Sequence, residues 1–287
     1  MIYTITLNPA LDRTLWVDRI LRDDSNRILK EQALAFVGGF AGEELEGRLL
    51  NQGVACDFIH VSGETRTNIV VNDMSEGTQT VFSAKGPEIT PHELMALIHK
   101  VEELEKPHVV VISGSLPPGV HPEIYRRVVE ISRAHGAMVI LDTDGDALKT
   151  GIEGLPDAIK PNIHELSRLV GRELKGLDEI TAAARSVRKK GVGTVLVSMG
   201  AKGILLVSGR EQYLASPPQV KVVNTIGAGD SAVAGFVYGL EEGKEMKEAL
   251  CYAVAAGTAT TLQPGTALCR NEDFKALIPQ VEVHQLE

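Results

Sequence analysis

Hydrophobic positions in the first third of the chain follow the period of β-strands. Residues 2–7 alternate as a β-branched strand, and residues 14–20 and 66–72 alternate apolar with polar side chains. Residues 79–83 repeat this pattern after a connection at 73–78, which indicates a hairpin with 66–72. Alternation of this kind is typical of a sheet with one exposed face.

Further along the chain, short and nearly continuous apolar runs alternate with helical patterns. The apolar runs lie at 108–113, 137–142 and 194–198. The helical patterns lie at 91–105, 122–135, 178–190, 231–242, 245–262 and 271–278. Buried parallel strands that alternate with helices predict an α/β fold with a doubly wound, mostly parallel sheet.

No repeat, linker or low-complexity stretch divides the chain. We therefore expect a single α/β domain over residues 1–287. The alternating strands, from about 12–31 and 58–84, then form a small β-sheet lid that is inserted into this domain.

One junction between this lid and the core is unusually short. Residues 26–31 end in strand-like sequence, residues 33–37 have the pattern of a core strand, and only Gln32 lies between them. A connection to a parallel core strand usually takes a dozen or more residues and a helix. The sequence lacks such a crossover here.

Composition and charge narrow the range of partners. The 287 residues are 44% hydrophobic and 23% charged, which is typical of a soluble globular protein, and no apolar run reaches membrane-spanning length. The formal net charge of −9 argues against nucleic acid and anionic membranes as partners. An anionic small molecule needs only a local basic pocket.

The cysteines and histidines show no metal-binding pattern. Cys56, Cys251 and Cys269 are scattered, and the histidines form no H-x-x-x-H motif, so no zinc site is expected. Cys251 and Cys269 sit among apolar residues and are expected to be buried, inert thiols. With no signal peptide before the first strand, we expect a cytoplasmic protein.

The most specific chemical signal is the segment 224–236, where Asn-Thr-Ile-Gly-Ala-Gly-Asp opens a helix of small, apolar residues. A helix start attracts phosphate through its unpaired N–H groups and positive dipole end, and Gly227 and Gly229 let a charged oxygen approach the backbone. A carboxylate at Asp230 repels that ligand, which makes sense if it takes a proton from a hydroxyl that attacks the phosphate. The alternative for Asp230 is an ordinary helix N-cap.

Dinucleotide binding is a second reading of the same segment, because Gly227, Gly229 and Ala232 fit G-x-G-x-x-G/A and Glu248 lies at a suitable distance. A Rossmann unit requires a strand that ends at the acidic residue. Residues 245–262 have a helical pattern instead, so this reading fails.

Two further segments come after core strands and suit a nucleotide. Lys160 can neutralise phosphate and Glu165 can hold Mg²⁺ directly or through water, although Asn162 and Glu165 also fit a helix capping box. Ser198, Gly200 and Gly203 can admit a nucleotide at the carboxyl end of a strand, or form a tight turn into residues 204–207. The two roles of this turn are compatible.

Three residues are candidates for the acceptor site. Ser115 lies in a loop at 113–119. This loop either lines a substrate pocket or is an ordinary connection rich in Gly, Pro and Ser. Arg66 either binds a sugar phosphate or lies on the solvent-exposed face of its strand without a ligand. Asp12 binds sugar hydroxyls or forms an Asx-turn.

Taken together, these motifs resemble the ribokinase-like carbohydrate kinases, and most closely their sugar-phosphate branch, from Met1 to about Arg270. Residues 6–12 look like the branch's opening motif, 65–68 like its lid motif, and 113–119 like its substrate loop. The resemblance implies that the sugar phosphate is bound by Asp12, Arg66, Asn68 and Ser115, with Arg66 at the phosphate group.

The same resemblance assigns the nucleotide side of the site. Lys160, Asn162 and Glu165 match the family's N-x-x-E element near Mg²⁺ and the γ-phosphate. Its nucleotide loop is matched by Ser198, Gly200 and Gly203. The segment from Thr225 to Asp230 matches the family signature, which implies that the backbone of Gly227, Ala228 and Gly229 forms an anion hole and that Asp230 is the catalytic base.

The sequence departs from the family at the short junction. The family carries a G-G-K-G-x-N motif, whose glycines and Asn hold the sugar, and then a helix, between the lid and the second core strand. This sequence has no such segment. Because a core helix is hard to delete from an α/β sheet, we expect a break in the chain between Lys30 and Leu34. A continuous peptide is expected to expose the apolar side chains of Ile5, Leu7 and Phe36.

The resemblance implies an ATP-dependent kinase that phosphorylates a ketohexose phosphate. Fructose 1-phosphate is the first choice, and tagatose 6-phosphate and fructose 6-phosphate are alternatives. The implied cofactors are ATP and Mg²⁺, with a monovalent cation as a further candidate. A true deletion near Gln32 favours an alternative of another class, a non-catalytic sensor of a sugar phosphate or nucleotide. The apolar face of the lid predicts a homodimer formed through the lid.

Overall fold

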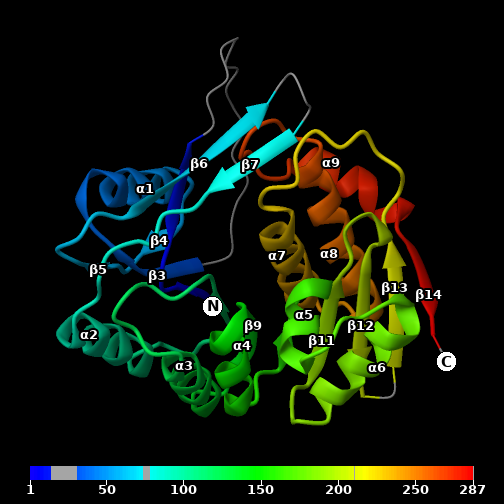
Figure 1. Cartoon of the computed structure of the whole chain (residues 1–287), viewed down its shortest axis with the longest axis horizontal. Coiled ribbons are helices and arrows are strands. Elements are labelled where there is room, and N and C mark those ends of the chain that lie inside the picture. Colours follow the sequence, from blue (N-terminus) through cyan, green and yellow to red (C-terminus); the bar gives the residue numbers. More distant parts are fainter. Residues whose placement is uncertain (14–30, 74–77, 210, 287) are drawn as a thin grey trace. The chain divides into compact units, whose positions relative to one another are not determined.

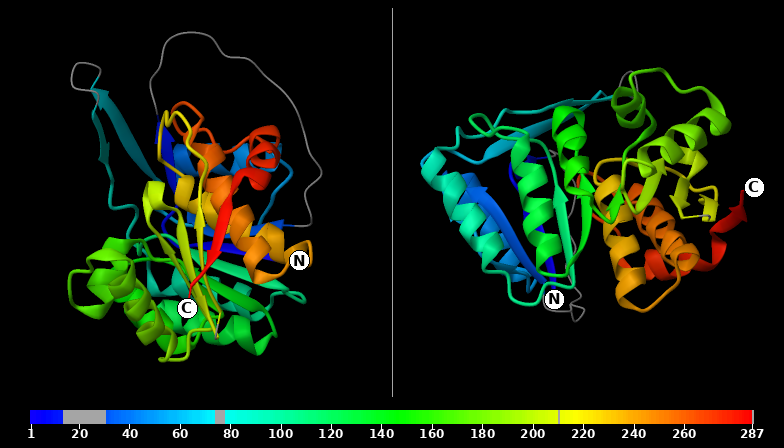
Figure 2. Two further views of the ribbon diagram at one scale, coloured as in Figure 1. Left: turned by 90° about the vertical axis from the view of Figure 1, so that its right-hand side faces the viewer. Right: turned by 90° about the horizontal axis from the view of Figure 1, so that it is seen from below.

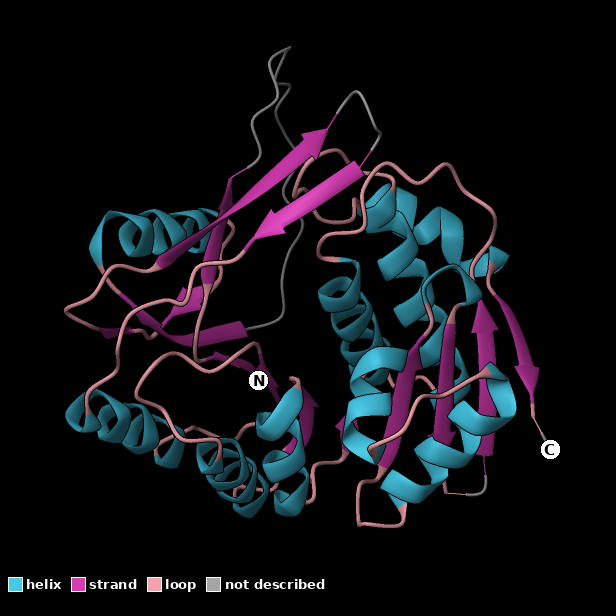
Figure 3. Cartoon of the chain, viewed as in Figure 1, coloured by secondary structure: helices cyan, strands magenta, loops and turns pink. Residues whose placement is uncertain are grey.

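The structure is a computed structural model that describes residues 1–13, 31–73, 78–209 and 211–286. These residues form two compact units, Met1–Asp157 and Ala158–Glu287. In each unit, helices lie against both faces of a β-sheet (Figures 1 and 3). The α/β fold class predicted from the sequence is confirmed.

The sheet of the first unit is parallel. Its strands pair in the order β9, β8, β1, β3 and β4, and β5 also pairs with β3. The strands are β1 Ile2–Thr6, β3 Glu31–Val37, β4 Ala55–Cys56, β5 Ile59–His60, β8 Val109–Ser113 and β9 Met138–Asp142. The runs predicted at 108–113 and 137–142 are confirmed as buried strands, because helices cover both of their faces.

The helices of the first unit include two that the sequence predicted. They are α1 Gly39–Asn51, α2 Pro91–Glu102, α3 Glu123–Ala134 and α4 Gly145–Gly151, followed by a 3₁₀ turn at Ile152–Gly154. A capping box explains where α2 begins: Thr90 Oγ1 accepts from the Glu93 N–H at 3.3 Å, and Glu93 Oε2 accepts from the Thr90 N–H at 2.7 Å. The patterns at 91–105 and 122–135 are thereby confirmed as α2 and α3.

The chain break expected between Lys30 and Leu34 is wrong. Residues Glu31, Gln32 and Ala33 belong to the uninterrupted strand β3 and pair in register with Ile2, Tyr3 and Thr4 of β1. Lys30 itself lies outside the described residues.

The exposure expected from a continuous peptide is also wrong, since Ile5, Leu7 and Phe36 are at most 1% exposed. Helix α1, which follows β3, covers one face of this strand, since its Leu45 and Leu49 pack against Ala33, Ala35 and Val37. Because side chains alternate along a strand, Phe36 lies on the opposite face, where it is buried as well. Both faces of β3 are therefore covered in the continuous chain.

A separate small sheet, the lid sheet, contains the described strands of the region predicted as a lid, which stays a prediction. Its strands are β2 Ala10–Arg13, β6 Arg66–Asp73 and β7 Thr78–Phe82, where β2 is parallel and β7 antiparallel to β6. The hairpin predicted from 66–72 and 79–83 is confirmed. The strand expected at 14–20 lies outside the described residues, as does most of that at 26–31.

The second unit has a mixed sheet. Its strands are β10 Ala158–Ile159, β11 Thr194–Ser198, β12 Ile204–Ser208, β13 Glu211–Ser216 and β14 Glu282–Gln285. β10 and β11 are parallel, whereas β11 to β14 follow one another antiparallel. The antiparallel part arises because a tight turn, rather than a helix, joins β11 to β12.

Helices cover this second sheet on both faces, with α5 and α6 on one side and α7 and α8 on the other (Figures 1 and 2). The helices are α5 Ile163–Val170, α6 Gly176–Arg188, α7 Ala228–Glu241, α8 Met246–Thr261 and α9 Asn271–Leu277, with 3₁₀ turns at Gly200–Lys202 and Ile278–Gln280. The predicted helices at 178–190, 231–242, 245–262 and 271–278 are confirmed within three residues at each end.

The cysteines are less buried than the sequence suggested. Cys251 and Cys269 are only partly buried. Burial nevertheless raises the pKa of both thiols above the usual range, which disfavours the reactive thiolate. In the described part of the chain, no helix is long and apolar enough to cross a membrane.

Candidate active site

Helix α7 begins at a glycine in the left-handed conformation, with no side chain capping its first N–H groups. Gly227 is the N-cap with φ of 75°, and a Cβ there would lie 2.9 Å from Leu268 Cδ2, so the position suits glycine. The Asn224 side chain shapes the preceding turn, since its Oδ1 accepts from the Ile226 N–H at 3.1 Å. The turn closes where the Ala228 N–H donates to the Thr225 carbonyl at 3.3 Å.

Asp230 is the third residue of α7 and its side chain is exposed. The N-cap alternative for Asp230 is wrong, because Gly227 holds that position and no side chain caps it. The next residue, Ser231, is buried and its Oγ lies 2.7 Å from Thr260 Oγ1 of α8. This contact holds the first turn of α7 against α8 and leaves Asp230 directed away from the core.

Lys160 lies beside the start of α7. The residue follows β10 and is 7% exposed, and its Nζ is 3.4 Å from the point that a Cβ on Gly229 would occupy. A lysine ammonium next to the positive end of a helix is a strong local attraction for an anion. The structure therefore brings together two elements that the sequence assigned separately to phosphate.

Asn162 and Glu165 form the capping box that the sequence offered as an alternative. Asn162 Oδ1 accepts from the Glu165 N–H at 2.9 Å, and Glu165 Oε2 accepts from the Asn162 N–H at 2.8 Å. Because Mg²⁺ is usually bound by one or two carboxylates together with phosphate oxygens, Glu165 Oε1 fits such a site. Among the described residues, no three His, Cys, Asp or Glu side chains gather as a metal cluster.

The β11–β12 turn has the predicted hairpin form. The Met199 N–H donates to the Gly203 carbonyl at 2.8 Å. Gly203 has φ of 93°, and a Cβ added there would lie 1.8 Å from the Ala215 carbonyl oxygen, so this position requires glycine. Gly200 has φ of 59° and open space around its Cα. Ser198 and Asn162 form a parallel bridge, so the turn lies at the same sheet edge as α5.

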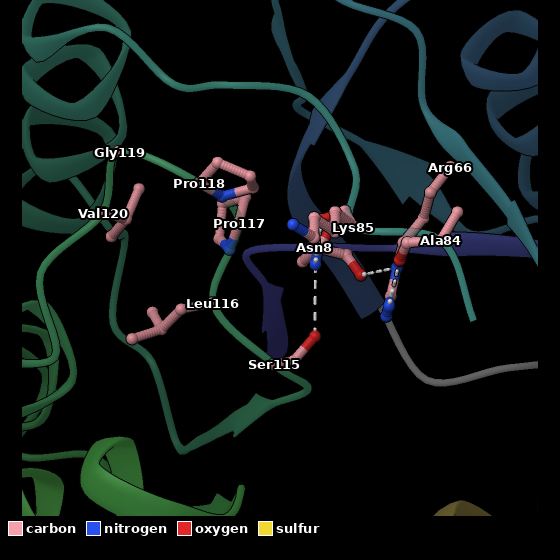
Figure 4. A pocket seen from close by; sticks show the side chains of 10 residues that line it. All are labelled: Asn8, Arg66, Ala84, Lys85, Ser115, Leu116, Pro117, Pro118, Gly119 and Val120. Atoms are coloured by element: carbon pink, nitrogen blue, oxygen red, sulfur yellow. Dashed lines mark hydrogen bonds between the residues drawn. The ribbon is translucent and has the colours of Figure 1, made fainter.

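A pocket of about 440 Å³ in the first unit contains two of the predicted substrate residues (Figure 4). It is lined by Asn8, Arg66, Ala84, Lys85 and residues 115–120, which include Ser115. The Arg66 guanidinium donates from Nε to the Asn8 carbonyl at 3.1 Å and from Nη1 to the Ala84 carbonyl at 3.2 Å. The Arg66 side chain is half-buried, so it is not fully exposed to solvent as one alternative predicted.

The other two predicted substrate residues lie on the lid sheet. Asp12 is the register partner of Asn68 in the β2–β6 ladder, and Ala10 is the partner of Arg66. Asn68 Oδ1 accepts from the Ala84 N–H at 3.2 Å, which ties β6 to the segment that follows β7. The opening and lid motifs are therefore adjacent in the structure.

Hydrogen bonds that the sequence did not predict hold Ser115 and the loop before it. Asn8 Nδ2 donates to Ser115 Oγ at 3.1 Å, and the hydroxyls of Tyr125 and Thr143 donate to the Gly114 carbonyl at 2.9 and 2.7 Å. Burial raises the pKa of Tyr125 far above its ordinary value, so its hydroxyl stays a donor. Only the Asn of the opening motif offered a signal, because the other contacts join distant segments.

Helix α7 thus begins with an exposed carboxylate and has a buried lysine beside its glycine backbone. These groups suit phosphoryl transfer to a hydroxyl group. The comparison with protein families agrees with this class of reaction. The chain belongs to the pfkB family of carbohydrate kinases, whose sequence profile matches residues 28–273.

Full-length relatives and solved structures support the assignment. The chain is 32% identical to 1-phosphofructokinase of Bacillus subtilis, with all of both chains covered, and 34% identical to ATP-dependent 6-phosphofructokinase isozyme 2 of Escherichia coli, with 96% and 97% covered. The structure of phosphofructokinase-2 from Escherichia coli in complex with potassium gives a TM-score of 0.87 at 32% identity, covering 97% and 98% of the chains. A possible 1-phosphofructokinase from Thermotoga maritima gives 0.87 at 26%, covering 100% and 99%.

The alignment with the Bacillus subtilis protein also shows a difference in length. The alignment with the Bacillus subtilis protein has 308 positions and covers all 287 residues of this chain. At least 21 of these positions (308 − 287) therefore hold a residue of the relative and a gap in this chain. Since both chains are covered completely, these positions are internal. This chain is therefore shorter than this relative within the aligned region.

Proposed function

We propose that this chain transfers the γ-phosphoryl group of ATP to a hydroxyl of a ketohexose phosphate, with fructose 1-phosphate as the first substrate. Tagatose 6-phosphate and fructose 6-phosphate are the alternatives. The observation that carries the proposal is the start of α7, where exposed Asp230 follows the glycine backbone beside Lys160. The relatives named as phosphofructokinases support the substrate class.

In this proposal, Asp230 accepts the proton of the attacking hydroxyl. The N–H groups of Gly227, Ala228, Gly229 and Asp230 stabilise the negative charge on the transferring group, as preorganised donors do in phosphoryl transfer. Nucleotide binding is assigned to Lys160, Asn162, Ser198, Gly200, Gly203 and Thr225.

Glu165 would hold Mg²⁺, which supplies charge neutralisation on the nucleotide phosphates. A monovalent cation is a further candidate cofactor, supported by the potassium complex of the Escherichia coli neighbour. The two compact units act as one catalytic domain in this proposal, and the protein works in the cytoplasm.

A panel assay tests the function. Purified protein with Mg·ATP is offered fructose 1-phosphate, fructose 6-phosphate, tagatose 6-phosphate or fructose, and ADP release is followed. We expect turnover with a ketohexose phosphate and little with fructose. Binding of sugar phosphate and nucleotide without ADP release would instead support the sensor, which the missing glycine-rich segment favours as second candidate.

Arg66 is proposed to bind the phosphate group of the acceptor. We expect Arg66→Ala to raise the KM for the sugar phosphate by about 10- to 100-fold, because a charge-assisted phosphate contact contributes about 1.5–3 kcal/mol. The KM for ATP should change by less than about threefold. Arg127→Ala, which removes an exposed arginine of α3, is the control. An unchanged sugar-phosphate KM would leave Arg66 with a purely structural role.

The lid is proposed to form a homodimer. Ile69, Val71 and Phe82 are 55%, 46% and 59% exposed, and Ile69 pairs directly with Phe82 across the β6–β7 ladder. Since side chains alternate along a strand, this apolar face lies opposite Arg66 and Asn68. Such a face suits an isologous contact with a second copy.

Phe82→Asp tests this interface. We expect the substitution to raise the dimer dissociation constant by at least about tenfold, because each copy would lose a buried aromatic contact and place a charge in the interface. Sedimentation velocity over a micromolar concentration series measures the effect. Phe40→Asp is the matched control, since Phe40 is 86% exposed on α1. A wild-type protein that is monomeric throughout would contradict the proposal.

A further inference from the structure

Lys85 is a charged residue of the substrate pocket that no motif singled out. Arg66 and Lys85 are the only charged residues among those that line this pocket, and both are cationic. Lys100 of the same unit, by contrast, is paired with the carboxylate of Asp57. In the described residues, the Lys85 ammonium has no hydrogen-bond or ion-pair partner.

Hydrogen bonds fix the backbone that carries Lys85. Asn8 Nδ2 donates to the Lys85 carbonyl at 3.2 Å and to Ser115 Oγ at 3.1 Å. The amide orientation is determined by this contact, because a carbonyl oxygen can only accept. The Arg66 guanidinium holds the neighbouring Ala84 carbonyl at 3.2 Å. Asn8 thus connects the segments that carry Arg66, Lys85 and Ser115 (Figure 4).

Gly86 makes this close approach possible. It has φ of 82°, and a Cβ at this position would lie 2.2 Å from Asn8 Oδ1. The chain therefore turns immediately after Lys85, directly over the Asn8 amide. The backbone of Lys85 is held in place, while its exposed side chain remains free to reach a ligand in the pocket.

We infer that Lys85 is a second phosphate-binding cation, which acts with Arg66 on the phosphate group of the acceptor. The inference rests on the proposed function and adds a second residue to the site that binds the acceptor's phosphate group. A phosphate monoester is close to a dianion at neutral pH, so one guanidinium compensates only part of its charge. The remaining lining includes Leu116, Pro117, Pro118 and Val120, which cannot compensate it.

Lys85→Gln tests the inference in the full chain. We expect the dissociation constant for fructose 1-phosphate, measured by calorimetric titration, to rise about five- to tenfold, while affinity for ATP is unchanged. Lys85→Arg should retain most of the wild-type affinity because it keeps the positive charge. Lys149→Gln is the matched control, since it removes an exposed lysine of α4 outside the pocket.

Binding and turnover separate the possible failures. Wild type that binds fructose 1-phosphate without producing ADP would contradict the kinase proposal and still allow the Lys85 comparison. A Lys85→Gln affinity within twofold of both wild type and Lys149→Gln would overturn the inference. Failure of wild type to bind any of the phosphorylated ketohexoses would overturn it as well. Unchanged circular dichroism and ATP affinity show that the variant is folded.

Discussion

Asp230→Asn is expected to lower kcat by at least about 10²-fold, while folding and ATP binding persist. Asparagine is nearly isosteric with aspartate and preserves the first turn of α7, but it cannot accept a proton from the attacking hydroxyl. If removal of the base affects the chemical step, kcat falls while the KM for ATP stays near the wild-type value. Steady-state kinetics with Mg·ATP and fructose 1-phosphate measure both parameters.

The chain offers a close control for this substitution. Asp178 is the third residue of α6, as Asp230 is the third residue of α7, and both side chains are exposed. Asp178→Asn therefore makes the same change at the same helix position, with the same effect on the helix dipole. Turnover of Asp230→Asn within a few-fold of Asp178→Asn would remove Asp230 as the base.

The parts of the fold that the sequence predicted have a local origin. The strands β8, β9 and β11 are buried on both faces, so their near-continuous apolar runs stand out from the surrounding helices. The start of α5 is local too, because Asn162 and Glu165 complete their capping box within four residues. Such elements were predicted to within a few residues.

Helix α1 was missed because its start depends on distant residues. The Ala41 N–H donates to Glu64 Oε1 and the Gly38 N–H donates to Thr65 Oγ1, both at 2.9 Å. These partners lie more than twenty residues further along the chain. The helix also buries few residues completely, so its apolar stripe is weak.

The expected chain break failed for a related reason. A helix before β3 was expected as the cover of this strand, whereas α1, which follows β3, packs on its Ala33–Ala35–Val37 face, and Phe36 on the other face is buried too. Which helix packs on β3 depends on contacts between distant elements. The local sequence of β3 therefore does not predict it. The substrate pocket is similar, since Asn8, Arg66, Lys85 and Ser115 come from four separate segments.

The position of α7 depends on glycines in its interface with α8. A Cβ on Gly235 would lie 2.4 Å from the Tyr252 carbonyl oxygen and 2.8 Å from Ala256 Cβ. Gly239 is similarly close, at 2.8 Å from Ala249 Cα. The obstacles are largely backbone atoms, which cannot move aside as a flexible side chain does. The two helices can approach this closely only because both positions lack a side chain.

Gly235→Ala is therefore expected to destabilise the protein by about 2–3 kcal/mol, although alanine favours a helix over glycine by about 1 kcal/mol. Gly47→Ala is the matched control, because Gly47 lies within α1 with no atom within 4 Å of its virtual Cβ. That variant should gain about 0.5–1 kcal/mol. Urea denaturation measures both free energies of unfolding.

The same variant tests whether the α7–α8 contact positions the catalytic groups. To accommodate a methyl group at residue 235, α7 must shift away from α8, and the shift is transmitted along the rigid helix to Gly227 and Asp230. Because phosphoryl transfer depends on donor positions within fractions of an ångström, kcat should fall at least about tenfold at a temperature where the variant is folded. A variant with wild-type stability would show that the helices separate without cost. A destabilised variant with wild-type kcat would show that the start of α7 keeps its position independently of this contact.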